Sequence, residues 1–253
     1  MDLGLQDKVV VVTGSSRGIG LAEAQLFAAE GARVAINGVD PGRAESAAAA
    51  IRAAGGEAQA FAADVTRAAA VDELFARVAA ALGPCDVLVN NAGLAGRHLG
   101  KPADRITEED WDAVLDSHLR ATWLCTRAAL PAMRAAGWGR IVLVSAGSAY
   151  LRNHSIYGLA KQALSFLAEE LALELGPEVT VNAVAPGQIA ESADDIAEFD
   201  PSFVERAIAH TPAGRLATRA EVAELVTALC GPSFDMVTGA TLPVDGGWRL
   251  QRF

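Results

Sequence analysis

Cysteine is scarce in this chain of 253 residues, which contains three. Cys85, Cys125 and Cys230 lie far apart and give neither a disulfide framework nor the close spacing of a metal site. Free cysteine packs readily as a small apolar residue, so all three are expected in the core. The four histidines are equally isolated in the sequence, and we expect no metal site.

Long apolar runs are missing as well. A membrane-spanning helix needs roughly 20 consecutive apolar residues, and Gly, Asp or Arg interrupts every run before that length. The first eight residues are acidic and polar, unlike a secretion signal, so we expect a soluble, cytoplasmic protein. With 21 basic and 31 acidic side chains the net charge is -10, which disfavours nucleic acid and anionic membranes as partners.

Hydrophobic residues make up 51% of the chain, enough for one large core, and a single domain is expected over residues 1–253. Short β-branched runs predict strands at Val9 to Val12, Val34 to Ile36, Ala58 to Ala62, Val87 to Val89, Ile141 to Val144, Val179 to Val184 and Thr241 to Val244.

Ala-rich amphipathic stretches between these runs are typical of helices. They cover Gly18 to Ala29, Arg43 to Ala54, Ala68 to Leu82, Glu108 to Ala135, Ile156 to Leu175 and Arg219 to Leu229. Nearly continuous apolar strands, each followed by a helix, predict an α/β fold with a doubly wound parallel sheet and helices on both faces. Ligands of such sheets bind beyond the carboxyl ends of the strands.

A glycine-rich turn follows the first predicted strand, where residues 13–20 read Thr-Gly-Ser-Ser-Arg-Gly-Ile-Gly. Glycine lets backbone N–H groups approach an anion without a Cβ in the way. The helix that begins there adds its positive end, so the turn could hold a pyrophosphate. The alternative is that the glycines only change the direction of the chain.

Tyr157 and Lys161 lie one turn apart at the start of a predicted helix and share one face. A phenol has a pKa near 10, and a neighbouring ammonium would lower it into the range useful for proton transfer. Lysine occurs only three times against eighteen arginines, which suggests that a compact ammonium is needed at this position. The alternative is a packed tyrosine beside a solvated lysine.

Taken together, these motifs resemble those of the short-chain dehydrogenase/reductase family, classical type. The resemblance covers about residues 8–247 and rests on Thr13-Gly14, Gly18-Ile19-Gly20, Asp64-Val65, Asn90-Asn91-Ala92-Gly93, Ser145, Tyr157, Lys161, Asn182 to Gly187 and Asp245-Gly246-Gly247. It implies a single-domain, seven-stranded Rossmann fold. It also implies hydride transfer between NAD or NADP and a secondary alcohol or ketone, and a homodimer or homotetramer.

The resemblance further implies a cofactor that lies across the strand ends. The glycine-rich turn would meet its phosphates and ribose, the pair after the third strand its adenine, and the residues after the sixth strand its carboxamide end. The cofactor-binding residues would be Gly14, Ser16, Arg17, Gly18, Ile19, Gly20, Asp64, Val65, Asn91, Ala92, Gly93, Tyr157, Lys161, Pro186, Gly187 and Ile189. For each loop residue the alternative is a purely local role in the turn.

In the implied mechanism Tyr157 protonates the carbonyl oxygen or removes the hydroxyl proton, and Lys161 lowers the tyrosine pKa and holds the ribose hydroxyls. The family usually has its catalytic serine thirteen residues before the tyrosine, where this chain has Val144. We predict that Ser145 takes that role and orients the substrate oxygen, because it directly follows the apolar run. Ser148 is the alternative.

His118 aligns with a fourth catalytic residue of the family, usually an asparagine that holds a water near the lysine. Histidine also forms hydrogen bonds with carbonyls and water, and it titrates near neutrality. One interpretation is that His118 replaces the asparagine in a proton relay. The other is a core-facing histidine that leaves a weaker relay.

The choice between NAD and NADP stays open in the sequence. An acidic residue near Gly38 would favour NAD, and an arginine near Val39 would favour NADP; the chain has neither. Arg17 and Arg43 could meet a 2′-phosphate, whereas Asp40 would oppose it.

Residues 188–215 occupy the position of the family's substrate-covering lid, with a surface helical hairpin as the alternative. Within them, Ser192 could replace a threonine that contacts the nicotinamide or its phosphates. The lid and the loop over residues 94–104 would select a small-molecule alcohol or ketone, which their side chains do not identify. His98 and His154 could face this substrate, although a simple loop position is the first interpretation.

Two other functions remain open at this point. A lyase on the same scaffold would have arginine in place of Lys161 and would lack the glycine-rich turn, so the sequence argues against it. A protein that binds the dinucleotide without turning it over is compatible with the histidine at position 118.

Overall fold

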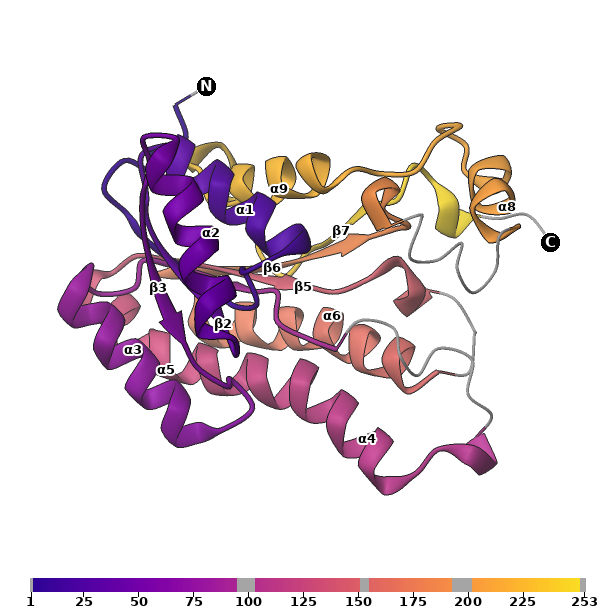
Figure 1. Ribbon diagram of the computed structural model, residues 1–253, viewed down its shortest axis with the longest axis horizontal. Helices are drawn as coiled ribbons and strands as arrows, with labels where there is room; N and C mark the ends of the chain where they lie inside the picture. Colours follow the sequence, from indigo (N-terminus) through magenta and orange to yellow (C-terminus); the bar gives the residue numbers. More distant parts are fainter. Residues whose placement is uncertain (1, 95–102, 151–154, 193–201, 251–253) are drawn as a thin grey trace.

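The fold is built on a parallel sheet of seven strands in the order β3-β2-β1-β4-β5-β6-β7 (Figure 1). The computed structural model describes residues 2–94, 103–150, 155–192 and 202–250. The strands are β1 (Val9–Val12), β2 (Arg33–Gly38), β3 (Glu57–Ala62), β4 (Val87–Asn90), β5 (Gly139–Val144), β6 (Val179–Pro186) and β7 (Thr241–Val244). All six neighbouring pairs are parallel. The predicted α/β class and all seven predicted strands are confirmed.

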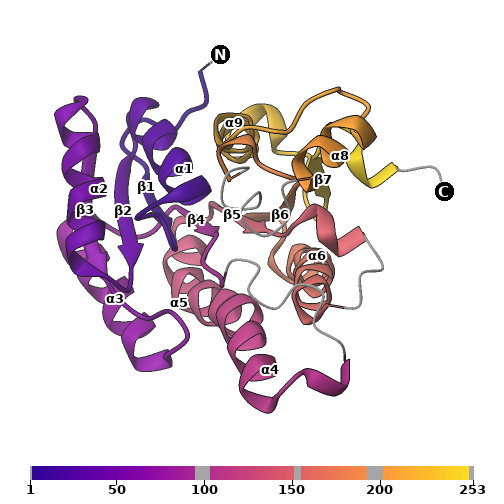
Figure 2. The same cartoon turned by 45° about the vertical axis from the view of Figure 1, so that its right-hand side comes forward.

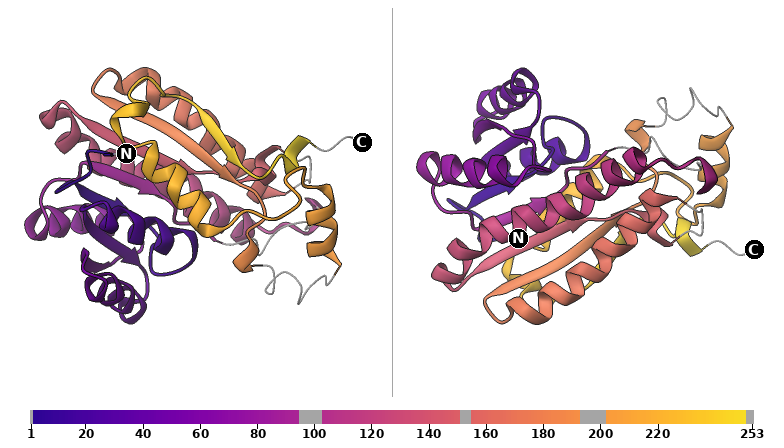
Figure 3. Two further views of the ribbon diagram at one scale, coloured as in Figure 1. Left: turned by 90° about the horizontal axis from the view of Figure 1, so that it is seen from above. Right: turned by 90° about the horizontal axis from the view of Figure 1, so that it is seen from below.

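Helices cover both faces of the sheet (Figures 2 and 3). The longer helices are α1 (Gly18–Ala29), α2 (Pro41–Ala53), α3 (Ala68–Ala81), α4 (Glu108–Leu115), α5 (Ala121–Ala136), α6 (Ile156–Leu175), α8 (Phe203–His210) and α9 (Arg219–Ala228). Shorter helical turns are η1 (Ala103–Arg105), η2 (Asp116–Arg120), η3 (Gly147–Tyr150), η4 (Ala190–Ser192), η5 (Pro232–Phe234) and η6 (Trp248–Leu250). Side chains of α1, α2 and α9 pack in one core layer, and those of α3, α5 and α6 pack in the other.

Strand β1 shows how the sequence builds the two core layers. Its four residues are all valine and all fully buried. Val10 and Val12 join the layer under α1, while Val9 and Val11 join the layer under α3, because successive side chains of a strand point to opposite faces. A fully buried side chain of this size contributes about 1.5–3 kcal/mol relative to an exposed one.

The predicted helix from Glu108 to Ala135 is interrupted. It begins with a capping box, in which Thr107 and Asp110 each accept a hydrogen bond from the other's backbone N–H. Its middle, η2, is a π-helical turn, and α5 continues directly from it. Such turns are frequent at functional sites, and this one contains His118.

The order of the strands locates the expected binding crevice. From β1 the chain proceeds outward through β2 and β3, and it then returns to place β4 on the other side of β1. Such a reversal opens a crevice beyond the carboxyl ends of the two central strands. The glycine-rich turn follows β1 and Asn91 follows β4, so both lie at this crevice.

Part of the predicted lid over residues 188–215 is described. It comprises η4 and α8, whereas residues 193–201 fall outside the described residues, as do His98 and His154. That residues 188–215 form a substrate-covering lid within a single domain stays a prediction. None of the helices formed by the described ranges has the length and hydropathy that a membrane-spanning helix needs.

Candidate active site

The glycine-rich turn needs glycine for two physical reasons. Gly14 and Gly18 both have φ of +65°, which side chains with a Cβ rarely adopt. In addition, a Cβ on Gly14 would lie 2.9 Å from Cα of Ala92, and one on Gly20 would lie 2.4 Å from Nδ2 of Asn91. The turn is therefore packed tightly against the segment that follows β4.

Helix α1 begins directly at this turn, and its first two residues, Gly18 and Ile19, line a cavity at the crevice. Arg17 occupies the N-cap position in an extended conformation, and its side chain makes no capping hydrogen bond. Unsatisfied N–H groups and the helix dipole make such a start a site for an anion. The predicted role in phosphate binding therefore has a physical basis in this geometry.

Polar side chains hold the turn and the end of β4 together. The hydroxyl of Thr13 accepts hydrogen bonds from the backbone N–H groups of Asn91 and Ala92, at 3.1 and 3.0 Å. Nδ2 of Asn91 donates to the carbonyl oxygens of Thr13 and Gly14, at 2.9 and 3.2 Å. Asn91 and Ala92 thus hold the glycine-rich turn in place, and their contact with a cofactor stays a prediction.

Asn37, at the end of β2, was missed by the sequence analysis. Its Oδ1 accepts a hydrogen bond from the N–H of Gly14 at 3.3 Å, and its Nδ2 donates to the carbonyls of Phe61 and Ala63. The side chain is 1% exposed and joins three strand ends. The sequence feature that could have identified Asn37 is an amide side chain inside an otherwise apolar strand.

A cavity of about 310 Å³ lies where the adenine half of a dinucleotide is expected. Asp64 and Val65 line it, as predicted from the sequence, together with Ser16 and Arg17. Oδ1 of Asp64 also accepts hydrogen bonds from the N–H and the hydroxyl of Thr66, at 3.0 and 2.7 Å. The carboxylate therefore has a structural partner as well as a position at the cavity.

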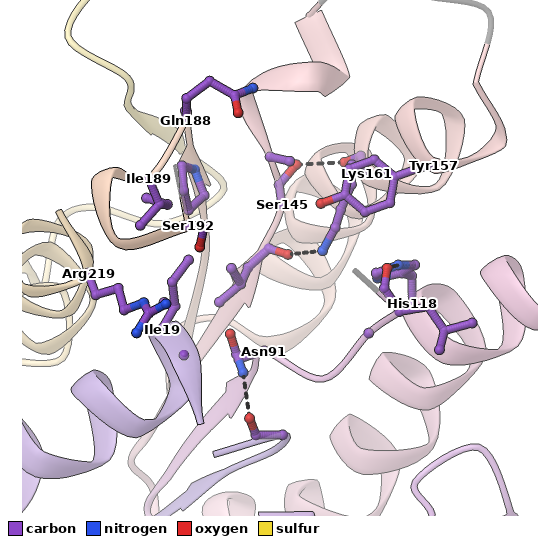
Figure 4. A pocket seen from close by; sticks show the side chains of 18 of the residues that line it. Ile19, Asn91, His118, Ser145, Tyr157, Lys161, Gln188, Ile189, Ser192 and Arg219 are labelled. Carbon is purple, nitrogen blue, oxygen red and sulfur yellow. Dashed lines mark hydrogen bonds between the residues drawn. The ribbon is translucent and has the colours of Figure 1, made fainter. Parts of the chain in front are cut away.

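A larger cavity of about 580 Å³ joins the turn to Tyr157 and Lys161 (Figure 4). The predicted residues that line this cavity come from six separate parts of the sequence. Its lining includes Gly14, Arg17, Gly18, Ile19, Asn91, Gly93, His118, Ser145, Tyr157, Lys161, Pro186, Gly187 and Ile189 among the predicted residues. Ser192, the predicted replacement for a threonine, lines it too.

Helix α6 presents Tyr157 and Lys161 to this cavity. The helix starts at Ser155, whose hydroxyl accepts a hydrogen bond from the N–H of Gly158 at 3.0 Å. Nζ of Lys161 lies 5.6 Å from the centroid of the Tyr157 ring and donates to the carbonyl of Val144 at 2.7 Å. The predicted meeting of phenol and ammonium is confirmed, with the ammonium also tied to the end of β5.

The expected depression of the tyrosine pKa is not found. Burial raises the pKa of Tyr157 to about 12 and lowers the pKa of Lys161 to about 7, because desolvation disfavours the charged form of each group. Lys161 is 4% exposed, and burial outweighs its attraction to a carboxylate on α1, Glu23, which acts in the opposite direction. A neutral phenol is therefore the main form at neutral pH.

Ser145 lies at the end of β5 and is 2% exposed. Its hydroxyl donates to the carbonyl of Lys161 at 2.7 Å and lies 3.2 Å from the hydroxyl of Ser165. In this conformation its proton points to α6, so orientation of a substrate oxygen would require the hydroxyl to rotate. That catalytic role stays a prediction; the side chain of the alternative, Ser148, is outside the described residues.

Replacement of Ser145 by Ala is expected to lower the free energy of unfolding by about 0.5–1.5 kcal/mol, because the buried hydrogen bond from its hydroxyl to the carbonyl of Lys161 is lost. Urea unfolding of S145A and wild type measures this loss. If the catalytic prediction also holds, kcat falls by about 100-fold while the affinity for cofactor is retained. A kcat within a few-fold of wild type would contradict that role.

His118 packs against Tyr157. The two rings meet edge to face with centroids 5.3 Å apart, and Nε2 of His118 lies 3.3 Å from the carbonyl of Leu94. Burial, aided by the charge of Lys161, lowers the pKa of His118 to about 3. The expectation that His118 titrates near neutrality was wrong, since desolvation keeps the imidazole neutral.

The tight packing of His118 explains why position 93 is glycine. A Cβ on Gly93 would lie 2.0 Å from Cε1 of His118. Nδ1 of the imidazole is buried without a hydrogen-bond partner among the described residues. In the neutral imidazole, Nε2 carries the proton and donates it to the carbonyl of Leu94, so Nδ1 is the nitrogen that can accept a hydrogen bond.

The segment after β6 closes the far side of the cavity. Pro186 ends the strand, and a Cβ on Gly187 would lie 2.7 Å from Cβ of Asp245, so the chain is packed closely against the end of β7. Ile189 pairs with Ala217 in a parallel bridge. These contacts place the predicted residues at the cavity wall.

The sequence analysis missed three further lining residues, Gln188, Trp248 and Arg219. Trp248 is 8% exposed and lies in η6, directly after the Asp-Gly-Gly motif. Arg219 is the first residue of α9. Gln188 and Trp248 each directly follow a recognised motif, whereas Arg219 is far from all of them in sequence, so only the fold brings Arg219 to the cavity.

The family described as enoyl-(acyl carrier protein) reductase matches residues 14–249. The short-chain reductase protein NovJ of Streptomyces niveus is 38% identical over 252 residues, covering 96% of this chain and 94% of that protein. Cis-4-hydroxycyclohexanecarboxylate dehydrogenase of Sinomonas cyclohexanicum is 38% identical over 245 residues, covering 96% of each.

A solved structure supports the same relationship. The gluconate 5-dehydrogenase of Burkholderia cenocepacia, in complex with NADP and tartrate, superposes with a TM-score of 0.91 at 29% identity, covering 98% of this chain and 97% of that chain. Fold, motifs and relatives agree over nearly the whole length. The chain belongs to the short-chain dehydrogenase/reductase family, as an NAD(P)-dependent oxidoreductase of alcohols or ketones.

Proposed function

We propose that this protein reduces a ketone to a secondary alcohol with NADPH, and that Tyr157 donates the proton. The observation that carries the proposal is that Tyr157, Lys161 and the glycine-rich turn line one cavity, although they are separated widely in sequence. A redox carrier held at the turn and a proton donor at the other end are the two parts that carbonyl reduction needs.

The residues of the crevice fit a dinucleotide. The start of α1 has no side-chain cap, and a Cβ on Gly18 would meet nothing within 4 Å, so a ligand's phosphates have room close to the backbone there. The charged residues on the wall of the larger cavity, among those the structure describes, are Arg17, Lys161 and Arg219, all basic. A cationic lining in a chain of net charge -10 favours an anionic cofactor.

When bound, the nicotinamide supplies the hydride. Tyr157 would place its hydroxyl at the substrate oxygen and give up its proton as negative charge develops there. With its pKa raised to about 12, the phenol holds this proton at neutral pH, which suits reduction better than oxidation. Lys161, with its pKa lowered to about 7, is the adjacent group that would return a proton to the phenolate.

Two further residues would assist Tyr157. We propose Ser145 as the hydroxyl that orients the substrate oxygen after rotation from the Lys161 carbonyl. His118 would act as a neutral hydrogen-bonding group, with Nδ1 accepting from a water in the relay to Lys161. A relay through a charged imidazole is disfavoured by the same burial.

The preference for NADP rests on the charges near the end of β2. Oδ2 of Asp40 forms an ion pair with Nε of Arg43 at 2.9 Å, and its Oδ1 caps α2 by accepting from the N–H of Arg43. Arg43 therefore balances the negative charge of Asp40, which would otherwise repel a 2′-phosphate. Position 38 is glycine and offers no carboxylate to a ribose hydroxyl, while Arg17 lines both cavities.

Replacement of Arg17 by Ala is expected to weaken NADPH binding by about 10- to 100-fold, because a charge-assisted contact with the 2′-phosphate is lost. Binding of NADH, which lacks that phosphate, should change much less. Calorimetric titration of both ligands on R17A and wild type measures the difference. Equal weakening of the two would show that Arg17 does not select the cofactor.

The proposed reaction is tested in two steps. Calorimetry first establishes which dinucleotide binds the purified protein. A panel of ketones, sugars, steroids and 3-oxoacyl thioesters is then screened with the preferred reduced cofactor by following its absorbance band. Cofactor binding with no turnover on a broad panel would favour the non-catalytic dinucleotide-binding alternative.

We further propose that the protein is a homodimer or homotetramer. Helices α5 and α6 expose large apolar side chains, of which Trp123 is 52%, Phe166 is 60% and Leu173 is 83% exposed. Exposed apolar patches of this kind are typical of association surfaces, and a second copy of the chain can cover them symmetrically.

A further inference from the structure

The start of α9 places a basic side chain opposite the glycine-rich turn. Arg219 is the first residue of α9, which follows the N-cap Thr218. Helices α1 and α9 pack side by side (Figures 1 and 2), and the first residues of both line the larger cavity. Figure 4 shows the guanidinium of Arg219 beside Ile19, the second residue of α1, at the end of the cavity away from Tyr157.

The contacts of Arg219 fix its backbone and leave most of its guanidinium available. Its backbone N–H is 3.2 Å from both carboxylate oxygens of Glu191. This carboxylate therefore accepts a hydrogen bond from the backbone at the start of α9. Nη2 donates to the backbone carbonyl of Glu191 at 3.1 Å. Among the described residues, no ion pair between this guanidinium and a carboxylate is present, so its remaining N–H groups can reach a ligand.

We propose that Arg219 binds the pyrophosphate of the cofactor from the side opposite to the start of α1, with Ser192 next to it on the same wall. Ile19 and Ser192, which border the guanidinium in Figure 4, both line the cavity. A planar guanidinium forms paired hydrogen bonds with phosphate oxygens, which backbone N–H groups alone cannot supply on that side. This inference rests on the proposed function and adds one specific residue to it.

The position of Arg219 favours the pyrophosphate over other anionic groups as its ligand. Arg219 is adjacent to the first turn of α1, where phosphates are expected, and not to the hydroxyl of Tyr157, where the substrate reacts. It is also absent from the smaller cavity beside Gly38 and Asp64, where a 2′-phosphate would lie. Arg219 should therefore contribute equally to the binding of NAD and NADP.

The test compares ligands with and without a pyrophosphate. R219A is expected to weaken binding of NADPH, NADH and ADP-ribose by about 10- to 100-fold, and to change the binding of AMP by less than about three-fold. R219K retains the positive charge but lacks the planar guanidinium, so it should restore part of the lost affinity. Calorimetric or fluorescence titration gives the dissociation constants.

Two control variants separate this effect from structural damage. R219M retains the backbone N–H that donates to Glu191 and a side chain of similar length without the charge, and it should weaken ADP-ribose binding as R219A does, with an unchanged thermal unfolding curve. R134A removes an exposed arginine on α5 that pairs with Glu174, and it should leave all affinities within about two-fold.

The outcomes distinguish this inference from the proposed function. Wild-type and R219A proteins that bind ADP-ribose equally well would overturn the role of Arg219 alone, and so would an equal loss for AMP. A wild type that binds the dinucleotides but reduces no ketone would overturn the proposed reaction and leave this role intact. A wild type that binds none of these ligands would overturn both.

Discussion

Replacement of Tyr157 by Phe is expected to lower kcat for ketone reduction by about 10³-fold or more, with the dissociation constant of the cofactor within a few-fold of wild type. The change removes one hydroxyl and preserves the ring that packs edge to face against His118. Proton transfer by a positioned side chain contributes typically about 10²- to 10⁴-fold. Steady-state assays and cofactor titration measure the two quantities separately.

The chain offers a matched control for this substitution, because Tyr150 is its other tyrosine. Tyr150 ends η3, is 38% exposed and packs against the guanidinium of Arg249. Y150F removes the same hydroxyl from a position outside the cavity lining and should leave kcat within a few-fold of wild type. Turnover retained in Y157F, or lost equally in both variants, would contradict the assignment of the proton donor.

Replacement of Glu23 by Gln is expected to stabilise the protein increasingly as the pH rises from about 5 to 8. Glu23 on α1 is fully buried, and neither carboxylate oxygen has a hydrogen-bond partner among the described residues. Burial raises its pKa from 4.5 to about 8, although the charge of Lys161 acts in the opposite direction. An acid that is protonated when folded and ionised when unfolded favours unfolding.

The sign follows from the two protonation states. Below pH 4.5 the carboxyl is protonated in both states and has no effect on the pH dependence. Between 4.5 and about 8 only the unfolded chain releases the proton, so wild type loses about 1.4 kcal/mol of stability per pH unit from this group. Above about 8 the folded state ionises too, and the loss reaches its maximum of several kcal/mol.

Urea unfolding at several pH values and one protein concentration measures this effect as the difference between E23Q and wild type. Taking the difference reduces the opposite pH dependence of buried Lys161 but does not cancel it, because Glu23 raises the pKa of Lys161. E224Q, which changes an exposed glutamate of α9, should show a difference that does not vary with pH. A pH-independent difference for E23Q would show that Glu23 is ionised in the folded state.

Much of the fold could be predicted from local sequence. Strand β1 is a run of four buried valines, and Gly14 and Gly18 have a positive backbone φ, which is a local requirement for glycine. Tyr157 and Lys161 are one helical turn apart, so their proximity needs only the helix itself. Features that depend on one segment were therefore predicted well.

Features that depend on burial or on distant segments were not. The tyrosine and histidine at the site were expected to titrate near neutrality, but desolvation moves the pKa of Tyr157 up and that of His118 down. The hydroxyl of Ser145 was expected to face a substrate, and it contacts α6. Sequence periodicity shows which face of an element is apolar, but not how deeply a polar side chain is desolvated.

The sequence by itself determined the parallel α/β architecture, the glycine-rich turn and the Tyr157–Lys161 pair, because each follows from short-range periodicity, backbone sterics or spacing. Only the tertiary structure decided that Arg219 faces the start of α1, that Asn37 joins three strand ends, and that Glu23 is buried without a partner. These depend on which elements pack together and on the exclusion of water between them, and both are properties of the assembled sheet and its helices.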